Sequence, residues 1–206
     1  MPEAERHVGA LDPPDQTCCA RNVLRADQSN APWRPNLSWI TDHLAVGGRF
    51  PTDRAENLAR ELTVRAVVDL RSEDRDDEAI LQRHGITLLH LPTDDHHAVS
   101  QPMLEDGVAC VRPFLDQGQR VLIHCEHGIG RSATLALCVL VDQGFEPLQA
   151  LELSKTRRAL ISPSPAQYHA WTAWLAGFAR ENRAGWEIPS FDAFKAIAYR
   201  HLQPVT

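Results

Sequence analysis

The sequence predicts an α/β domain with a central, mainly parallel sheet of four to five strands flanked by helices. Short, buried-type strands alternate with segments of helical period along the chain. The 206 residues suffice for one domain of ordinary size. A hydrophobic fraction of 43% and a charged fraction of 23% are close to the globular average and do not fit a wholly disordered chain. In such sheets, ligands bind at the carboxyl ends of the strands.

Four segments are predicted as strands. Three of them are short, apolar and rich in β-branched residues: 66–70 (AVVDL), 86–92 (ITLLHLP), which Pro92 is expected to end, and 120–125 (RVLIHC). A shorter strand is expected at 44–47 (LAVG), where a glycine pair then turns the chain.

Helices are expected where apolar residues recur at helical spacing. Thr52 or Asp53 is expected to cap the first helix, and the charged cluster 71–78 is interpreted as the solvated start of the second, which stops near Gly85. The others are 103–118, 132–144, about 147–160, about 164–180 and, more weakly, 191–201.

The chain divides into three segments. Residues 1–35 contain five prolines and no sustained period, which predicts an irregular arm. Residues 36–180 form the α/β domain, and residues 181–206 form a C-terminal helical extension. The sequence does not assign a role to either flanking segment.

Charge and cysteine usage exclude several classes of protein. A net charge of −6 disfavours a nucleic-acid binder. No apolar run reaches the length of a membrane helix, and the N-terminus lacks the features of a signal peptide, so we expect a cytoplasmic protein. Five cysteines, an odd number without zinc-site spacing, argue against a disulfide framework and predict at least one free, reduced thiol. The pair Cys18-Cys19 is expected in an exposed tail.

One loop lies between the buried strand 120–125 and the apolar helix 132–144, and residues 124–132 read HCEHGIGRS. The first amides of a helix have no partners within it and carry the positive end of its dipole. Gly128 and Gly130 allow unusual backbone dihedral angles and close approach to a ligand. These features predict a ring of amides that binds an anion.

Two side chains of this loop are predicted to act on the bound anion. Arg131 lies six residues after Cys125, so its guanidinium can return over a curled loop and bind two oxygens. Amide dipoles, the helix N-terminus and the Ser132 hydroxyl all favour thiolate over thiol at Cys125. A thiolate that faces a tetrahedral oxyanion is a nucleophile aimed at phosphorus.

These residues resemble the cysteine-based protein tyrosine phosphatases. HCEHGIGRS matches the signature H-C-x-x-G-x-x-R-[ST], and the span 38–178 is similar to the compact dual-specificity-like branch. The resemblance implies the phosphatase fold, a catalytic domain at 36–180, and chemistry without a metal or other cofactor. It also implies that the phosphate-binding residues are Glu126, His127, Gly128, Ile129, Gly130 and Arg131.

The resemblance implies further roles. The family takes its general acid from an Asp about thirty residues before the cysteine, and the pattern Pro-x-x-Asp selects Asp95, with Asp94 as the alternative acid. The family often has a second proline a few residues further on, but residues 98–100 here read AVS. His124 is expected to support the loop by hydrogen bonding, and Ser132 to stabilise the departing thiolate.

Several other side chains have plainer interpretations. Arg157 and Arg158 are interpreted as a solvated helix face, and Gln167 as a surface glutamine at a helix start. Asp69 and Arg71 are expected to organise neighbouring loops, and Cys138 to lie in the core.

The resulting prediction is a phosphomonoester hydrolase of the protein tyrosine or dual-specificity type, acting through a phosphocysteine on Cys125. A lipid or small-molecule phosphomonoesterase with the same chemistry is the main alternative, although acidic Glu126 disfavours a polyphosphorylated head group. A silent phosphate-binding module and a rhodanese-like sulfurtransferase remain as further alternatives. The rhodanese loop typically places its arginine five residues after the cysteine, one fewer than here. The predicted partner is a phosphorylated protein or small phosphomonoester, and the oligomeric state is left open.

Overall fold

The structure is a computed structural model that describes residues 33–202. The predicted irregular arm and the Cys18-Cys19 pair therefore lie outside the described residues, apart from residues 33–35. Within residues 33–202 no helix is long and apolar enough to cross a membrane.

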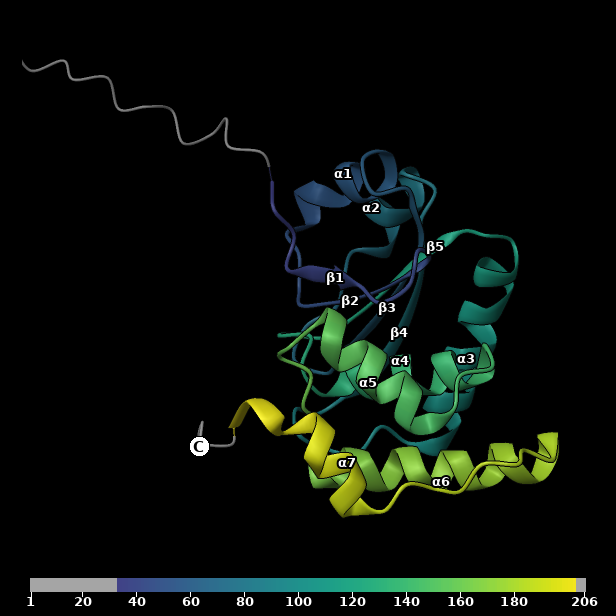
Figure 1. The fold of residues 1–206 in the computed structure, drawn as a ribbon. Coiled ribbons are helices and arrows are strands. Elements are labelled where there is room, and N and C mark those ends of the chain that lie inside the picture. Colours follow the sequence, from purple (N-terminus) through teal and green to yellow (C-terminus); the bar gives the residue numbers. More distant parts are fainter. Residues whose placement is uncertain (1–32, 203–206) are drawn as a thin grey trace, which may run out of the picture. The chain divides into compact units, whose positions relative to one another are not determined.

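The fold is the predicted α/β class, with a five-stranded sheet of order β1-β2-β5-β3-β4 (Figure 1). The strands β2, β5, β3 and β4 are mutually parallel, and only β1 is antiparallel to its neighbour β2. Their bounds are β1 Leu37–Trp39, β2 Leu44–Gly47, β3 Val64–Arg71, β4 Thr87–Thr93 and β5 Arg120–His124. Because β5 lies at the centre of the sheet, the loop that follows it opens where ligands bind in parallel sheets.

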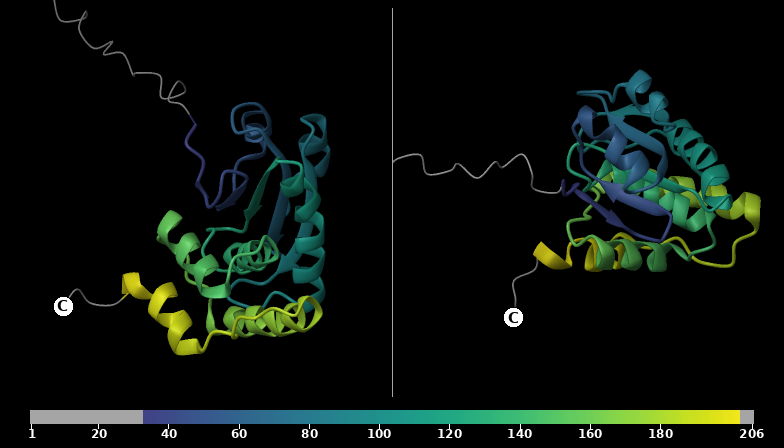
Figure 2. Two further views of the ribbon diagram at one scale, coloured as in Figure 1. Left: turned by 45° about the vertical axis from the view of Figure 1, so that its right-hand side comes forward. Right: turned by 90° about the horizontal axis from the view of Figure 1, so that it is seen from above.

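The helices follow the predicted order. They are α1 Ala55–Arg60, α2 Glu78–Arg83, α3 Gln101–Asp116, α4 Arg131–Asp142, α5 Pro147–Arg157, α6 Pro165–Asn182 and α7 Phe191–Ala198, with short 3-10 turns η2 Thr52–Arg54 and η3 Arg200–Leu202. Both α3 and α4 contact the sheet, and α4 also contacts α5 and α6. The helix α7 lies beside α5 (Figure 2).

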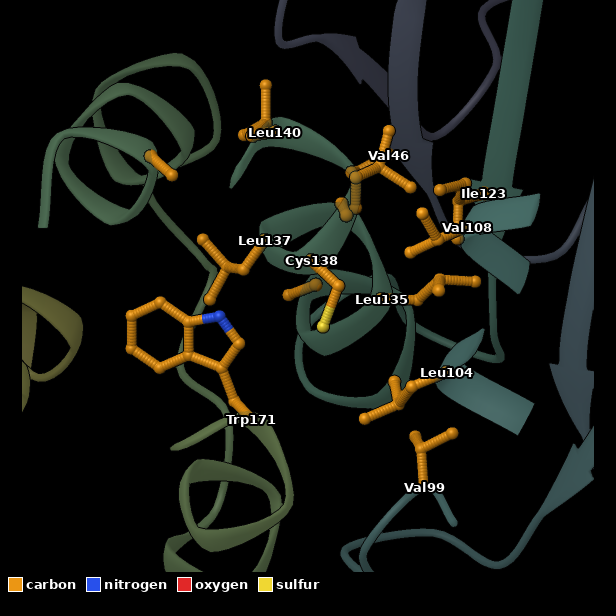
Figure 3. Packing of buried hydrophobic residues seen from close by; sticks show 14 of the residues in the cluster. Val46, Val99, Leu104, Val108, Ile123, Leu135, Leu137, Cys138, Leu140 and Trp171 are labelled. Carbon is orange, nitrogen blue, oxygen red and sulfur yellow. The ribbon is translucent and has the colours of Figure 1, made fainter. Parts of the chain in front are cut away.

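The core is built around α4, whose residues from Arg131 to Val141 are all buried. Figure 3 shows Cys138 on this helix among Leu135, Leu137 and Trp171. The Cys138 side chain is fully buried, which raises the pKa of its thiol well above the usual value, so the predicted core role is confirmed.

Three local predictions were wrong. Pro92 does not end its strand, because β4 is an edge strand beside a register shift, where a missing N–H is tolerated. Neither Thr52 nor Asp53 caps α1, since both lie in the preceding 3-10 turn. The charged cluster 71–78 is not a solvated helix start: α2 begins only at its last residue, and two of its charged side chains are buried.

Candidate active site

The loop 125–130 joins β5 to α4 and curls tightly against the end of β2. Gly128 has a φ of +70°, which favours glycine, and a Cβ at this position would lie 2.5 Å from the carbonyl oxygen of Gly47. Only glycine therefore fits the loop at position 128. The curl directs the Gly128 N–H inward, where it donates to Cys125 Sγ at 3.3 Å.

Cys125 occupies the base of this loop and is 3% exposed. Its Sγ lies 3.3 Å from Ser132 Oγ. Burial alone raises the pKa of the thiol, but hydrogen bonds from the Ser132 hydroxyl and from the backbone amides of Ser132, Gly128 and His127 outweigh it and lower the pKa. These donors favour the thiolate, which is the nucleophilic form.

Arg131 is 1% exposed and is held by groups from two other segments. Its Nη1 and Nη2 donate to the two Glu73 carboxylate oxygens at 2.7 and 2.8 Å, and Nη1 also donates to the Thr93 carbonyl at 2.8 Å. Its Nε is buried without a hydrogen-bond partner. A buried guanidinium N–H that lacks a partner is costly, so a bound oxyanion is a fitting acceptor for it.

The two candidate acids point in different directions. Asp95 Oδ1 lies 3.3 Å from Arg131 Nη2, and its carboxylate is half exposed. Asp94 instead accepts a hydrogen bond from Ser72 Oγ at 2.6 Å, on the side of the loop after β3. The geometry thus brings Asp95, and not Asp94, to the guanidinium that faces Cys125. The carbonyl of His96 accepts from Ser164 Oγ at 2.8 Å, which ties the acid loop to the start of α6.

His124 lies beneath the loop in a buried polar cluster. Its Nε2 bonds Asp76 Oδ2 at 2.8 Å, and its Nδ1 lies 3.3 Å from the Cys125 carbonyl oxygen. Burial opposes protonation, but the hydrogen bond and charge of Asp76, with the charge of Asp69, raise the pKa of His124. Arg71 Nη2 donates to Asp69 at 2.9 Å and to Asp76 at 2.7 Å. These contacts fix the His124 side chain next to Cys125.

This cluster contains the one group of three described side chains, Asp69, Asp76 and His124, whose ligand atoms come close enough to hold a metal ion. The Arg71 guanidinium already supplies a positive charge to both carboxylates. The donor set therefore fits an internal ion-pair network that supports the loop.

The remaining loop residues line the outer rim. Glu126 pairs with Arg49 at 2.7 Å, and His127 is exposed. Both border a hollow of about 390 Å³, which is also lined by Asn36, Arg49, Phe50 and Pro51. Gly130 lies against Gln167, where an added Cβ would come within 2.5 Å of Oε1. These residues surround the site with both polar and apolar groups.

Two interpretations from the sequence were wrong, both for residues that pack against the outer side of the loop. Arg158 is 5% exposed, and it donates to the Gly128 and His127 carbonyls at 2.7 and 2.8 Å and to Asn36 Oδ1 at 2.8 Å. Gln167 is 1% exposed and accepts the Ser164 N–H in a capping box. Arg157, by contrast, is exposed as expected.

Sequence reasoning also missed Glu73 as the partner of Arg131. A usable signal was present, because the cluster 71–78 begins at the carboxyl end of β3, the strand next to β5. Parallel neighbours bring such ends together. For Arg158 no comparable signal exists, since its place behind the loop depends on how α5 ends.

The buried cysteine, the amides that face it and the buried arginine at the end of a parallel sheet define a class of protein: an α/β fold with a cysteine loop between a central strand and a helix. Comparisons with known proteins agree. Residues 48–145 match a family described as a polymorphic toxin system DSP-PTPase phosphatase. A solved structure of PTPMT1 in complex with PI(5)P superposes with a TM-score of 0.65 at 22% identity, covering 69% of this chain and 96% of that one.

Curated relatives point to the same family. Dual specificity protein phosphatase 5 of Rattus norvegicus is 32% identical over 133 residues, covering 61% of this chain and 32% of the relative. A putative tyrosine-protein phosphatase, R622, of Acanthamoeba polyphaga mimivirus is 22% identical over 168 residues, covering 62% and 78%. The chain thus spans about a third of the length of the first relative. The chain is thus similar to the cysteine-based protein tyrosine phosphatases of the dual-specificity-like kind.

Proposed function

We propose that this protein is a phosphomonoester hydrolase of the protein tyrosine or dual-specificity type. One observation carries the proposal: Cys125 Sγ accepts from the Gly128 amide beside Ser132 Oγ, in a loop closed by the buried guanidinium of Arg131. A low-pKa thiolate beside a cationic oxyanion site has the chemistry for attack on phosphorus. We propose residues 36–180 as the catalytic domain.

In the first step, Cys125 Sγ attacks phosphorus and the bond to the leaving oxygen breaks, giving a phosphocysteine. Asp95 donates its proton to the departing oxygen. Arg131 and the loop amides stabilise the charge on the equatorial oxygens, because they are fixed before the reaction and need no reorganisation. Glu73 keeps the guanidinium in place through its two hydrogen bonds.

In the second step, the Asp95 carboxylate takes a proton from water, whose oxygen attacks the phosphocysteine. The S–P bond breaks, inorganic phosphate leaves, and Ser132 donates a hydrogen bond to the regenerated thiolate. The nucleophile works only as a reduced thiolate, so we propose a reducing compartment such as the cytoplasm.

The substrate is proposed to be a phosphorylated protein, since curated relatives are named protein phosphatases. The test is hydrolysis of p-nitrophenyl phosphate in EDTA with a thiol reductant, followed by phosphotyrosine and phosphothreonine peptides and a monophosphorylated lipid. Turnover that is lost in Cys125→Ser and is fastest on peptides supports the proposal. Faster turnover of the lipid would favour the lipid phosphomonoesterase, and no turnover by the reduced wild type would contradict phosphatase function.

A further inference from the structure

The connection between α5 and α6, residues 158–164, backs the catalytic loop from outside. Arg158 donates to the carbonyls of His127 and Gly128, and the Ser162 N–H donates to the Ile129 carbonyl at 3.0 Å. Three successive loop carbonyls are thus bound by this connection. Because hydrogen bonds from the connection hold these carbonyls on the outer side of the loop, the position of the connection sets the position of the loop.

The same connection is held on its other side by two side chains. Tyr199, after α7, donates its hydroxyl to the Pro163 carbonyl at 2.6 Å. Lys155 on α5 is 2% exposed; its Nζ donates to the Ile161 carbonyl at 2.6 Å and lies 2.7 Å from His201 Nδ1. A buried lysine is costly unless its ammonium is hydrogen-bonded, so both contacts are needed at this position.

The C-terminal segment is itself anchored in the core. Phe194 on α7 is fully buried and lies 4.9 Å from the Tyr168 ring, measured between ring centroids. The Tyr168 hydroxyl donates to the Pro189 carbonyl at 2.8 Å. Figure 2 shows α7 alongside α5. Residues 186–202, here called the strap, are therefore anchored to the core and can fix the position of the 158–164 connection.

We propose that the strap positions the catalytic loop, and that Tyr199 and Lys155 are positioning residues that act through the 158–164 connection. The inference rests on the proposed function for its activity readout alone. Loss of either contact frees the connection, so that the loop carbonyls shift and the amides facing Cys125 lose their alignment. A misplaced oxyanion site weakens both turnover and anion binding.

The test compares Tyr199→Phe with Tyr168→Phe in the full chain. Each variant removes one tyrosine hydroxyl that donates to a proline carbonyl, but only Tyr199 bonds the 158–164 connection. We expect Tyr199→Phe to lower kcat/KM for p-nitrophenyl phosphate about three- to tenfold and to weaken inhibition by phosphate. Tyr168→Phe removes a hydrogen bond at the start of the strap, which the buried Phe194 still anchors, and leaves the Tyr199 contact intact. We therefore expect both values to stay within about twofold of wild type in Tyr168→Phe, while the two variants lose similar stability.

Lys155→Met gives a second arm, because it keeps the apolar stem and removes the donor to Ile161. It should lower kcat/KM and phosphate affinity in the same direction as Tyr199→Phe, while urea unfolding confirms that the variant is folded. Equal effects of the two tyrosine variants, or folded Tyr199→Phe and Lys155→Met variants with wild-type values, would overturn the proposal.

Phosphate affinity, measured by thermal shift, and the pH profile of Cys125 alkylation separate this proposal from the proposed function. If the wild type lacks turnover, the proposed function fails, but a selective loss of phosphate binding in Tyr199→Phe still supports the strap. If turnover is normal and phosphate binding and alkylation are unchanged in that variant, the strap proposal fails alone.

Discussion

Asp95 Oδ1 lies 3.3 Å from Arg131 Nη2, whereas the neighbouring carboxylate of Asp94 is bound by Ser72 on another loop. The backbone after β4 therefore directs one of two adjacent acids toward Arg131 in the cysteine loop. The His96 residue that follows has a φ of +62°, and its carbonyl accepts from Ser164. This turn at 96, bonded to α6, holds the acid loop in the observed position.

The first prediction assigns the general acid. Asp95→Asn should lower kcat by about 10²- to 10⁴-fold for an alkyl or unactivated aryl phosphate, because such leaving groups need a proton. Asp94→Asn should change kcat less than about threefold, since its carboxylate bonds Ser72. The measurement is kcat for a series of phosphate esters of rising leaving-group pKa.

The loss of kcat in Asp95→Asn should grow as the pKa of the leaving group rises, and it should be small for p-nitrophenyl phosphate. A steeper dependence in Asp94→Asn than in Asp95→Asn would show that Asp94 is the acid.

The second prediction concerns the thiolate of Cys125. Its pKa lies below the ordinary value despite burial, owing to the Ser132 hydroxyl and the loop amides. A thiolate with a lowered pKa stays ionised as the pH falls, so Ser132→Ala should raise this pKa and move the rise of the alkylation rate to higher pH. At pH 6 we expect a rate about tenfold lower than in wild type.

The measurement is iodoacetamide labelling of the Cys125 peptide, followed by mass spectrometry between pH 5 and 9. Cys110 is an internal control: its side chain is only partly buried and lies on α3, and burial raises the pKa of its thiol. Its labelling should not change in Ser132→Ala. An unchanged Cys125 profile would mean that the amides alone stabilise the thiolate.

The third prediction tests the Glu73–Arg131 pair. The Arg131 hydrogen bond outweighs burial and holds the pKa of Glu73 at about 2. Since the folded pKa lies below the ordinary value of 4.5, the carboxylate stabilises the fold fully above pH 4.5, and this contribution is lost as the pH falls through about 2. Glu73→Gln should therefore lower stability at pH 7 but match wild type near pH 2.

The same variant should lower kcat about tenfold, because the guanidinium loses the charged partner that orients it. Urea unfolding as a function of pH and steady-state kinetics at pH 7 are the two measurements. Glu78→Gln is a matched control, since that exposed carboxylate pairs with Arg75 and accepts a hydrogen bond from Gln82, both away from Arg131. Equal kinetics in the Glu73 and Glu78 variants would show that the pair does not orient Arg131.

The sequence was most informative where the site is contiguous. The residues 124–132 are one strand end, one loop and one helix start, so the fold class, the place of Cys125 and the arginine six residues later follow from local pattern. The pairing of β5 with β2 and β3 could be inferred as a parallel sheet, but the strand order required the structure.

The sequence was least informative where charged side chains from distant segments meet behind or beside the loop. Glu73 and Arg158 lie 58 and 27 residues from Arg131 in the sequence, and each belongs to a charged run that ordinarily faces solvent. Their location follows from the crossover connections and from the end of α5, where Arg158 leaves helical geometry with φ −136° and ψ 91°. No residue pattern distinguishes the buried Arg158 from the exposed Arg157 beside it.

The fourth prediction tests the buried side of the loop by comparing Arg158→Met with Arg157→Met. Both variants remove a guanidinium from the end of α5, but only Arg158 donates to the loop carbonyls and to Asn36. Arg158→Met leaves those buried acceptors without a partner, so it should lower the free energy of unfolding by about 2–4 kcal/mol. Because Arg157 is exposed, Arg157→Met should lower the free energy of unfolding by less than about 0.5 kcal/mol.

The measurement is urea unfolding together with phosphate inhibition at a temperature where both variants remain folded. Weaker phosphate inhibition in Arg158→Met alone is expected, because the carbonyls of 127 and 128 are joined to the amides that bind the anion. Arg158→Lys separates charge from geometry: lysine keeps the charge but cannot donate to both carbonyls and Asn36 in one plane. A fully restored phosphate affinity in Arg158→Lys would show that charge alone holds the loop.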